Sequence, residues 1–229
     1  MRIVNETRTT GQRLPASDRR RQLLEMALDL FSRKGFGGTT TKEIAAAAGV
    51  TEAIIFRHFP SKQDLYNAVL NDHHESGQKA ECIAEWQSCM ERNDDRGLFR
   101  SMIARVIAAH REDPRVHRVL MFAALEGHEA ALEYNRQFSL PVYELLCQYV
   151  TRRQREGALR AGHPGAMIAA VYGMAEQYAT MTQMFGFRTD MTDGEAADSF
   201  VEIAMHGIQM PRTQMSGTQG KPSKRGQSK

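Results

Sequence analysis

The chain has 229 residues, of which 41% are hydrophobic and 25% charged, enough for one compact domain or two small ones with a sizeable core. No stretch approaches the roughly 18 apolar residues of a membrane-spanning helix, and the polar N-terminus has no apolar signal region, so we expect a cytoplasmic protein outside the membrane. Three scattered cysteines, Cys82, Cys89 and Cys147, have neither CxxC spacing nor a metal-ligand grouping, which favours free thiols and argues against a metal or another cofactor.

The net charge of +3 is distributed unevenly along the chain. Residues 1–62 contain eleven Lys and Arg against six Asp and Glu, whereas residues 63–210 contain fourteen against twenty-one. Residues 211–229 contain five basic residues and no acidic ones. A basic first quarter on an acidic body indicates that one end meets a polyanion, although a solvated basic face without a partner would show the same distribution.

Helix-forming residues abound and the alternation typical of strands is rare, so we expect an all-α fold of about nine helices. Residues 1–16 lack periodicity and predict a flexible basic arm. The first helix is expected over 18–34, with Ser17 as its N-cap and Gly35 directly after its end.

A pair of short helices follows. Thr40 and Glu43 fit a capping box that begins the second helix, and Gly49 supplies the left-handed backbone of a tight turn. Thr51 caps the third helix, which is narrow enough for the major groove of DNA. These features predict a helix-turn-helix over 40–59, although an ordinary buried helix pair would also fit a glycine-containing turn taken alone.

Apolar stripes at helical spacing predict the remaining helices. A fourth helix is expected from Lys62, and five more are expected over 95–111, 114–127, 131–156, 165–186 and 194–209. Pro141 is expected to kink or break the third of these five. The polar, basic residues 211–229 predict a disordered tail.

The run GGTTTKEIAAAAGVTEAIIFRHFPSKQDLYNAVL resembles the signature of the TetR/AcrR family of transcriptional regulators. The shared pattern is two Thr, Ile-Ala, Ala-Gly-Val-Thr, an aromatic-x-His-Phe ending, and Ser-Lys-x-x-Leu at the start of the fourth helix. The resemblance implies a helix-turn-helix DNA-binding domain over 17–77 and an effector-binding and dimerisation domain over 78–210. It also implies a homodimeric repressor that a small-molecule effector releases from a palindromic double-stranded operator.

The resemblance further implies roles for individual residues. Contacts to the phosphate backbone are implied for Thr40, Thr41, His58 and Lys62, and a contact to phosphate or a base is implied for Lys42. Contacts in the groove are implied for Thr51, Glu52, Ala53 and Arg57, of which Arg57 is the candidate for guanine readout. The chain departs from the family at Phe56, where a Tyr hydroxyl usually binds phosphate, and at Ile54, which would contact a thymine methyl or belong to the core.

The helix over 165–186 is apolar nearly all round and is therefore expected to be buried on most sides. Together with the resemblance, this predicts a four-helix dimer interface, the alternative being the core of a monomer. The predicted interface residues are Met167, Val171, Met174, Tyr178, Met181, Phe185, Val201, Ala204 and Ile208. The opposite face carries Ala166, Ala170 and Gly173, which are small enough for close approach of another helix.

Methionine and aromatic side chains of the middle helices are expected to enclose the effector. The candidate residues are Trp86, Met90, Met102, His110, Met121, Phe122, Phe138, Tyr143, Tyr172 and Glu176. Glu176 would receive a cationic or hydrogen-bonding ligand or would pair with an Arg across the dimer. His110 is equally consistent with a satisfied core residue.

Two other classes of protein remain open. One is an adaptor that keeps the helix-turn-helix but does not bind DNA. The other is a small all-α enzyme or metal protein, for which the eight His, including His73 and His74, are the best support. No HxxxH pair and no nucleophile–base constellation stands out, so we expect a regulator and not an enzyme.

Overall fold

The computed structural model describes residues 15–72 and 77–208, and these form α-helices α1 to α11 with one short π-helical segment and no strand. The expected all-α class is confirmed, with more and shorter helices than predicted. The predicted tail and nearly all of the predicted arm lie outside the described residues. None of the helices in the described ranges has the length and apolarity needed to cross a membrane.

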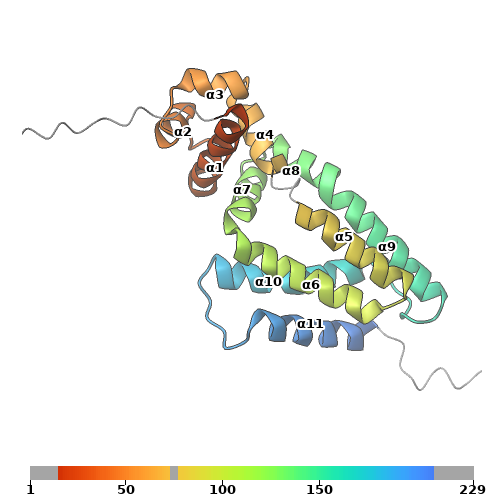
Figure 1. Cartoon of the computed structure of the whole chain (residues 1–229). Helices are drawn as coiled ribbons and strands as arrows, with labels where there is room; N and C mark the ends of the chain where they lie inside the picture. Colours follow the sequence, from red (N-terminus) through yellow and green to blue (C-terminus); the bar gives the residue numbers. More distant parts are fainter. Residues whose placement is uncertain (1–14, 73–76, 209–229) are drawn as a thin grey trace, which may run out of the picture. The chain divides into compact units, whose positions relative to one another are not determined.

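The chain folds as two compact units (Figure 1). The first unit consists of the described residues within Met1–Lys79 and Arg115–Asn135. The second unit consists of those within Ala80–Pro114 and Arg136–Lys229. The chain first crosses between the units after Lys79, and the boundary predicted at residue 77 stays a prediction. The return of 115–135 to the first unit has no counterpart in the prediction.

The first unit contains α1 (Ala16–Lys34), α2 (Thr41–Ala47), α3 (Glu52–His58), α4 (Lys62–Asp72), α7 (Pro114–Leu125) and α8 (Glu129–Tyr134). Its core combines α1 and α4 with one face each of α2, α3 and α7. Tyr66 of α4 is fully buried and donates a hydrogen bond to the carbonyl of Val119 at 3.2 Å. The segment over 115–135 is thus part of the core that supports the helix-turn-helix.

The second unit contains α5 (Gly77–Glu91, from residue 80 on), α6 (Asp95–Glu112), the π-helical Asn135–Ser139, α9 (Leu140–Arg155), α10 (Pro164–Gln183) and α11 (Asp193–Ile208). Both α10 and α11 pack along α6 (Figure 1). Where a kink or break was expected at Pro141, the helix changes type without a gap, since the π-helical segment ends at Ser139 and Pro141 stands in the first turn of α9.

Polar groups also lie inside the second unit. Asp95 accepts hydrogen bonds from Tyr149 at 2.5 Å and from the Arg153 guanidinium at 2.8 and 2.9 Å. The Asp95 and Arg153 side chains are only 9% and 13% exposed. The Asp95 carboxylate accepts the hydrogen bonds that the buried Arg153 guanidinium donates, so neither charge is buried without a partner. This pair joins the start of α6 to α9.

Candidate functional site

Local signals in the sequence form the helix-turn-helix of the first unit. The Thr40 hydroxyl accepts a hydrogen bond from the Glu43 amide at 3.2 Å, and the Glu43 carboxylate accepts one from the Thr40 amide at 2.8 Å. Gly49 has φ +65°, a conformation that strains residues with a Cβ. The capping box and the glycine turn predicted from the sequence are therefore confirmed.

The inward face of the helix pair is apolar. Ile44, Ala45, Ile55 and Phe59 are each at most 3% exposed and pack with α1 and α4. Burial of these side chains holds α2 and α3 against the rest of the unit. The opposite faces of both helices are left for a ligand.

The predicted DNA-contacting residues fall into two groups. Exposed are Thr40, Lys42, Thr51, Ala53, Phe56 and Arg57. Half-buried are Thr41, Glu52, Ile54, His58 and Lys62. Ala53 and Arg57 are four residues apart and lie opposite the buried Ile55, with Phe56 beside them, so they form one outward face of α3.

Two contacts hold the edges of this face in the free protein. The Thr41 hydroxyl donates a hydrogen bond of 2.6 Å to the Glu52 carboxylate, which joins the start of α2 to the start of α3. The Glu43 carboxylate accepts a 2.6 Å ion-paired hydrogen bond from Lys34, and this contact, with the bonds from Thr40, lowers the pKa of Glu43 to about 2. Glu43 therefore stays ionised at neutral pH.

Lys62 points inward. Its ammonium donates a hydrogen bond of 2.5 Å to the Phe36 carbonyl and lies 4.1 Å from the centroid of the Phe36 ring. Burial lowers the pKa of Lys62, while the charges of Glu126 and Glu43 act in the opposite direction. The phosphate contact predicted for Lys62 would require the ammonium to leave or share these partners.

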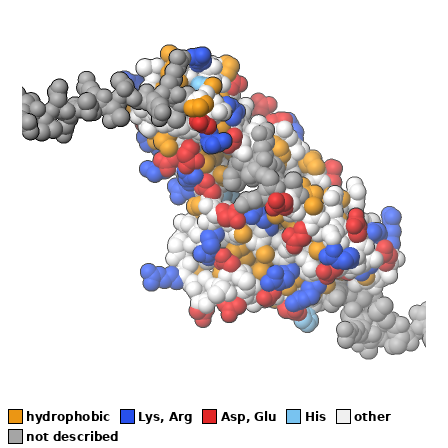
Figure 2. All heavy atoms as spheres, viewed as in Figure 1, with side chains coloured by type: hydrophobic (Ala, Val, Ile, Leu, Met, Phe, Trp, Pro, Cys, Tyr) orange, Lys and Arg blue, Asp and Glu red, His pale blue; other side chains and the backbone are white. Residues whose placement is uncertain are grey.

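Charge sign alone does not single out a binding face. Figure 2 shows Lys and Arg side chains interspersed with Asp and Glu over the surface that it views. The candidate DNA surface is instead defined by geometry, as the outward face of α3 beside the exposed Lys42 of α2.

The predicted effector residues do not fall into a single unit. Met121 and Phe122 belong to α7 of the first unit. In the second unit, Met90, Met102 and His110 are buried, Trp86, Phe138 and Glu176 are half-buried, and Tyr143 and Tyr172 are exposed. Their assignment to an effector pocket stays a prediction.

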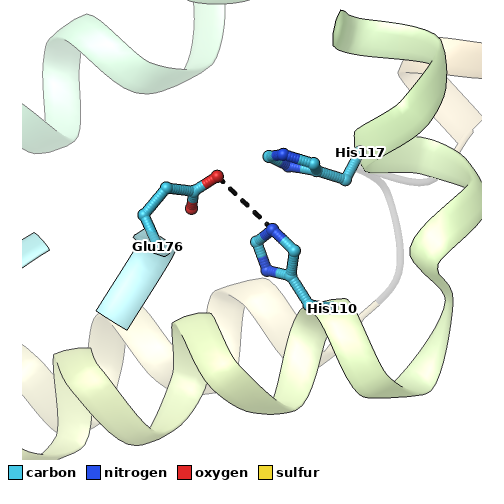
Figure 3. A group of neighbouring side chains, drawn as sticks. All are labelled: His110, His117 and Glu176. Atoms are coloured by element: carbon cyan, nitrogen blue, oxygen red, sulfur yellow. Dashed lines mark ion pairs between the residues drawn. The ribbon is translucent and has the colours of Figure 1, made fainter. Parts of the chain in front are cut away.

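Glu176 pairs with His110 inside the second unit, as Figure 3 shows. The His110 Nδ1 lies 2.9 Å from the Val106 carbonyl, and because a carbonyl only accepts, this nitrogen carries a proton. The His110 Nε2 lies 3.4 Å from a Glu176 carboxylate oxygen, where a second proton is stabilised. Burial lowers the pKa of His110, but the hydrogen bonds to Glu176 and Val106 raise it more, so the net shift is upward.

The His110–Glu176 pair alone does not make a metal site, because protein zinc sites use three or more ligands. The third side chain drawn in Figure 3, His117, belongs to α7 of the first unit. Within the second unit, Glu176 has His110 as a partner, and its pairing with an Arg across the dimer stays a prediction.

Five of the predicted dimer residues are buried in the core of their own chain, so their place in an interface stays a prediction. Met167, Val171, Val201, Ala204 and Ile208 are at most 7% exposed and pack with α6 and α9. Met174, Tyr178 and Met181 are half-buried, and Phe185 is exposed.

The small residues of α10 face outward instead. They line an apolar groove of about 740 Å³ that includes Ala169, Ala170, Gly173, Met174, Tyr178 and Phe200. Tyr172 of α10 and Ile203 of α11 are 49% and 62% exposed. Ala170 and Gly173 were expected to be small enough for close approach of another helix, but the dimer interface was predicted on the opposite face of this helix.

Comparisons with known proteins agree with this architecture. Residues 23–69 match the family model described as bacterial regulatory proteins, tetR family, and residues 101–204 match the model described as tetracyclin repressor-like, C-terminal domain. Together these matches span both units of the chain.

The similar proteins are regulators. The chain is 49% identical over 53 residues to the uncharacterized HTH-type transcriptional regulator YvkB of Bacillus subtilis, covering 23% of this chain and 28% of YvkB. It is 27% identical over 154 residues to the HTH-type transcriptional regulator TtgR of Pseudomonas putida, covering 67% of this chain and 65% of TtgR. The chain thus spans less than two thirds of the length of either relative.

The fold is also that of a solved regulator. The crystal structure of AibR in complex with isovaleryl coenzyme A and operator DNA is similar with a TM-score of 0.60 and 24% identity, covering 81% of this chain and 97% of AibR. The two matched family models agree with the capped helix-turn-helix of the first unit and with the helical second unit. The chain belongs to the TetR family of bacterial regulatory proteins.

Proposed function

We propose that the chain is a transcriptional regulator, and not an enzyme, that binds a double-stranded palindromic operator through the outward face of α3. The observation that carries this proposal is that Ala53 and Arg57 are exposed on a short helix whose other face is buried through Ile55. Such a helix can enter the major groove while α1, α2 and α4 hold it in place.

Arg57 is the residue of this face best suited to direct readout. A guanidinium can bond O6 and N7 of one guanine at the same time, and the Arg57 side chain is exposed. Thr40, Lys42 and Thr51 are exposed beside it and suit contacts to phosphate. Half-buried Thr41 and Glu52 are held by each other, so they position the two helices.

A single short recognition helix reads few base pairs, so the regulator is expected to act as a homodimer on two half-sites. The apolar groove along α10 and α11 supports this part of the proposal, because small residues such as Ala170 and Gly173 allow helices of a second copy to approach closely. In the DNA-bound state the two recognition helices would lie about 34–36 Å apart.

A small-molecule effector is proposed to bind the second unit and to release the operator. AibR, which has the same fold, was crystallised with both isovaleryl coenzyme A and operator DNA, and this supports the pairing of an effector with a DNA site. The effector must bind the two states of the regulator with different affinity for the operator to be released. A regulator of this kind acts in the cytoplasm, where its operator lies.

The test is selection of DNA by the full-length chain from fragments of the host genome, followed by fluorescence anisotropy between about 50 and 200 mM salt. We expect palindromic fragments to be enriched and their affinity to fall steeply with salt, because phosphate contacts release counterions. No enrichment, or binding that does not depend on salt, would instead identify an adaptor that keeps the fold without binding DNA.

A further inference from the structure

The backbone of Phe36, in the turn between α1 and α2, is hydrogen-bonded through both its amide and its carbonyl. The Phe36 amide donates a hydrogen bond to Glu126 Oε2 at 3.2 Å, and the Phe36 carbonyl accepts one from Lys62 Nζ at 2.5 Å. Glu126 lies directly after α7, 90 residues further along the chain. The two peptide groups that flank Phe36 are thus bonded by two side chains of opposite charge from distant parts of the first unit.

The Phe36 ring is packed by the same elements. His128, from the turn before α8, lies 4.5 Å from the Phe36 ring centroid, and Tyr66 of α4 lies 5.1 Å from it. The Lys62 ammonium lies over the ring at 4.1 Å, in cation–π geometry. Phe36 therefore has little freedom to move relative to α4 and the residues that follow α7.

Gly35 makes room for the Glu126 carboxylate. A Cβ at Gly35 would stand 2.3 Å from Glu126 Oε1 and 3.1 Å from the Phe122 ring. Gly35 also has φ +70°, which strains other residues. The turn thus lets the exposed Glu126 carboxylate lie close against its backbone.

We propose that Glu126 is a positioning residue for DNA binding, and that Lys62 acts with it as an internal clamp and not as a phosphate contact. The inference rests on the proposed DNA-binding function. The clamp fixes the turn that leads into Thr40, and the Thr41–Glu52 hydrogen bond carries this placement from α2 to α3.

The proposal extends the DNA-binding machinery beyond the matched helix-turn-helix. The N-terminal family model ends at residue 69, whereas Glu126 lies in the stretch matched by the C-terminal model. DNA affinity would then depend on a residue outside the segment conventionally assigned to DNA, because 115–135 belongs to the first unit.

The test compares full-length variants on DNA that the wild type selects. Glu126→Ala removes the acceptor of the Phe36 amide, and we expect the affinity for DNA to fall roughly tenfold. Glu126→Gln keeps an acceptor oxygen and should stay within about twofold of wild type. Glu129→Ala, a change at an exposed glutamate in the same segment, is the matched control and should bind like wild type.

Two readouts separate positioning from other roles. Hydrogen exchange at the Phe36 amide should speed up in Glu126→Ala and not in Glu126→Gln. The salt dependence of binding should keep the wild-type slope in Glu126→Ala and Lys62→Met, because neither variant loses a phosphate contact. A slope shallower by about one in Lys62→Met would overturn the clamp role and make Lys62 a phosphate contact.

The remaining outcomes are also decisive. Wild-type affinity in Glu126→Ala, with fast exchange at Phe36, would overturn the positioning role while leaving the proposed function intact. A loss shared equally by Glu126→Gln and Glu129→Ala, and matched by lower thermal stability, would overturn it as well. A wild-type chain that selects no DNA would instead overturn the proposed function, and the inference with it.

Discussion

The two units of the chain expose different kinds of surface. In the first unit, the outward face of α3 combines Arg57 with small and aromatic side chains, and charged residues such as Lys34 and Glu43 pair at its edge. In the second unit, α10 exposes an apolar groove, while Asp95 and His110 are kept inside. The first surface offers a guanidinium that can bond bases and the second offers only apolar contact, a difference in keeping with our proposal that DNA and a second copy bind separate units.

The largest expected effect is on the stability of the second unit. Asp95→Ala would remove the acceptor shared by the buried Tyr149 and Arg153 side chains and leave Arg153 with Glu156 alone, and we expect a loss of about 3–5 kcal/mol in the free energy of unfolding. Asp198→Ala, which breaks an exposed pair with Arg100, should cost at most about 1 kcal/mol. Denaturant unfolding measures both, and equal losses would show that burial of the Asp95 pair is unimportant.

The second effect concerns the apolar groove. Ala170→Glu would place a charge in the proposed dimer interface, and we expect association to weaken by about 2–5 kcal/mol. Sedimentation should show a shift to monomer, with a parallel loss of operator affinity. Gln148→Glu, on an exposed position of α9, is the control. A dimer of wild-type strength in Ala170→Glu would move the interface elsewhere.

The third effect concerns base readout by α3. We expect Arg57→Ala to cost about 1–3 kcal/mol of binding free energy and to relax the preference at one base pair. Affinities for operator variants changed one base pair at a time measure this directly. A loss that is uniform across all sequences would make Arg57 a phosphate contact.

The fourth effect is a pH dependence of the second unit. Because the pKa of His110 is raised in the folded chain, its pairing with Glu176 stabilises the fold fully below the ordinary histidine pKa of about 6.5 and loses that contribution as pH rises through the raised value. Unfolding of wild type and His110→Asn between pH 5.5 and 8.5 should show this fall only in wild type, at about these pH values. Parallel pH profiles would exclude His110 as the source.

The smallest effect concerns Phe56, which is 46% exposed where the family usually has Tyr. Phe56→Tyr would add a hydroxyl able to bond a phosphate, and we expect operator binding to tighten by about 0.5–1 kcal/mol. Phe56→Leu tests the same position without the hydroxyl and should not tighten binding. If Phe56→Tyr leaves the affinity unchanged, α3 does not present this side chain to the backbone of DNA.

The features that sequence reasoning predicted well depend on local interactions. The Thr40–Glu43 capping box and the Gly49 turn are set by residues a few positions apart, and both are present. The change of helix type just before Pro141 is equally local. Such signals survive folding because they need no knowledge of which helices pack together.

The features that it missed depend on packing between distant residues. The two faces of α10 were recognised, but Val171 and not Ala170 lies in the core beside α6. The inward turn of Lys62 and its link through Phe36 to Glu126 could not be foreseen, since Glu126 has no sequence pattern that ties it to residues 90 positions earlier.

The measurement that tests the central claim most directly is the affinity of the full-length chain for its selected DNA against a scrambled duplex of the same length at one salt concentration. A regulator that reads bases through α3 should prefer the selected duplex by about a thousandfold or more. Equal affinity for the two duplexes would contradict sequence-specific binding and with it the role assigned to α3.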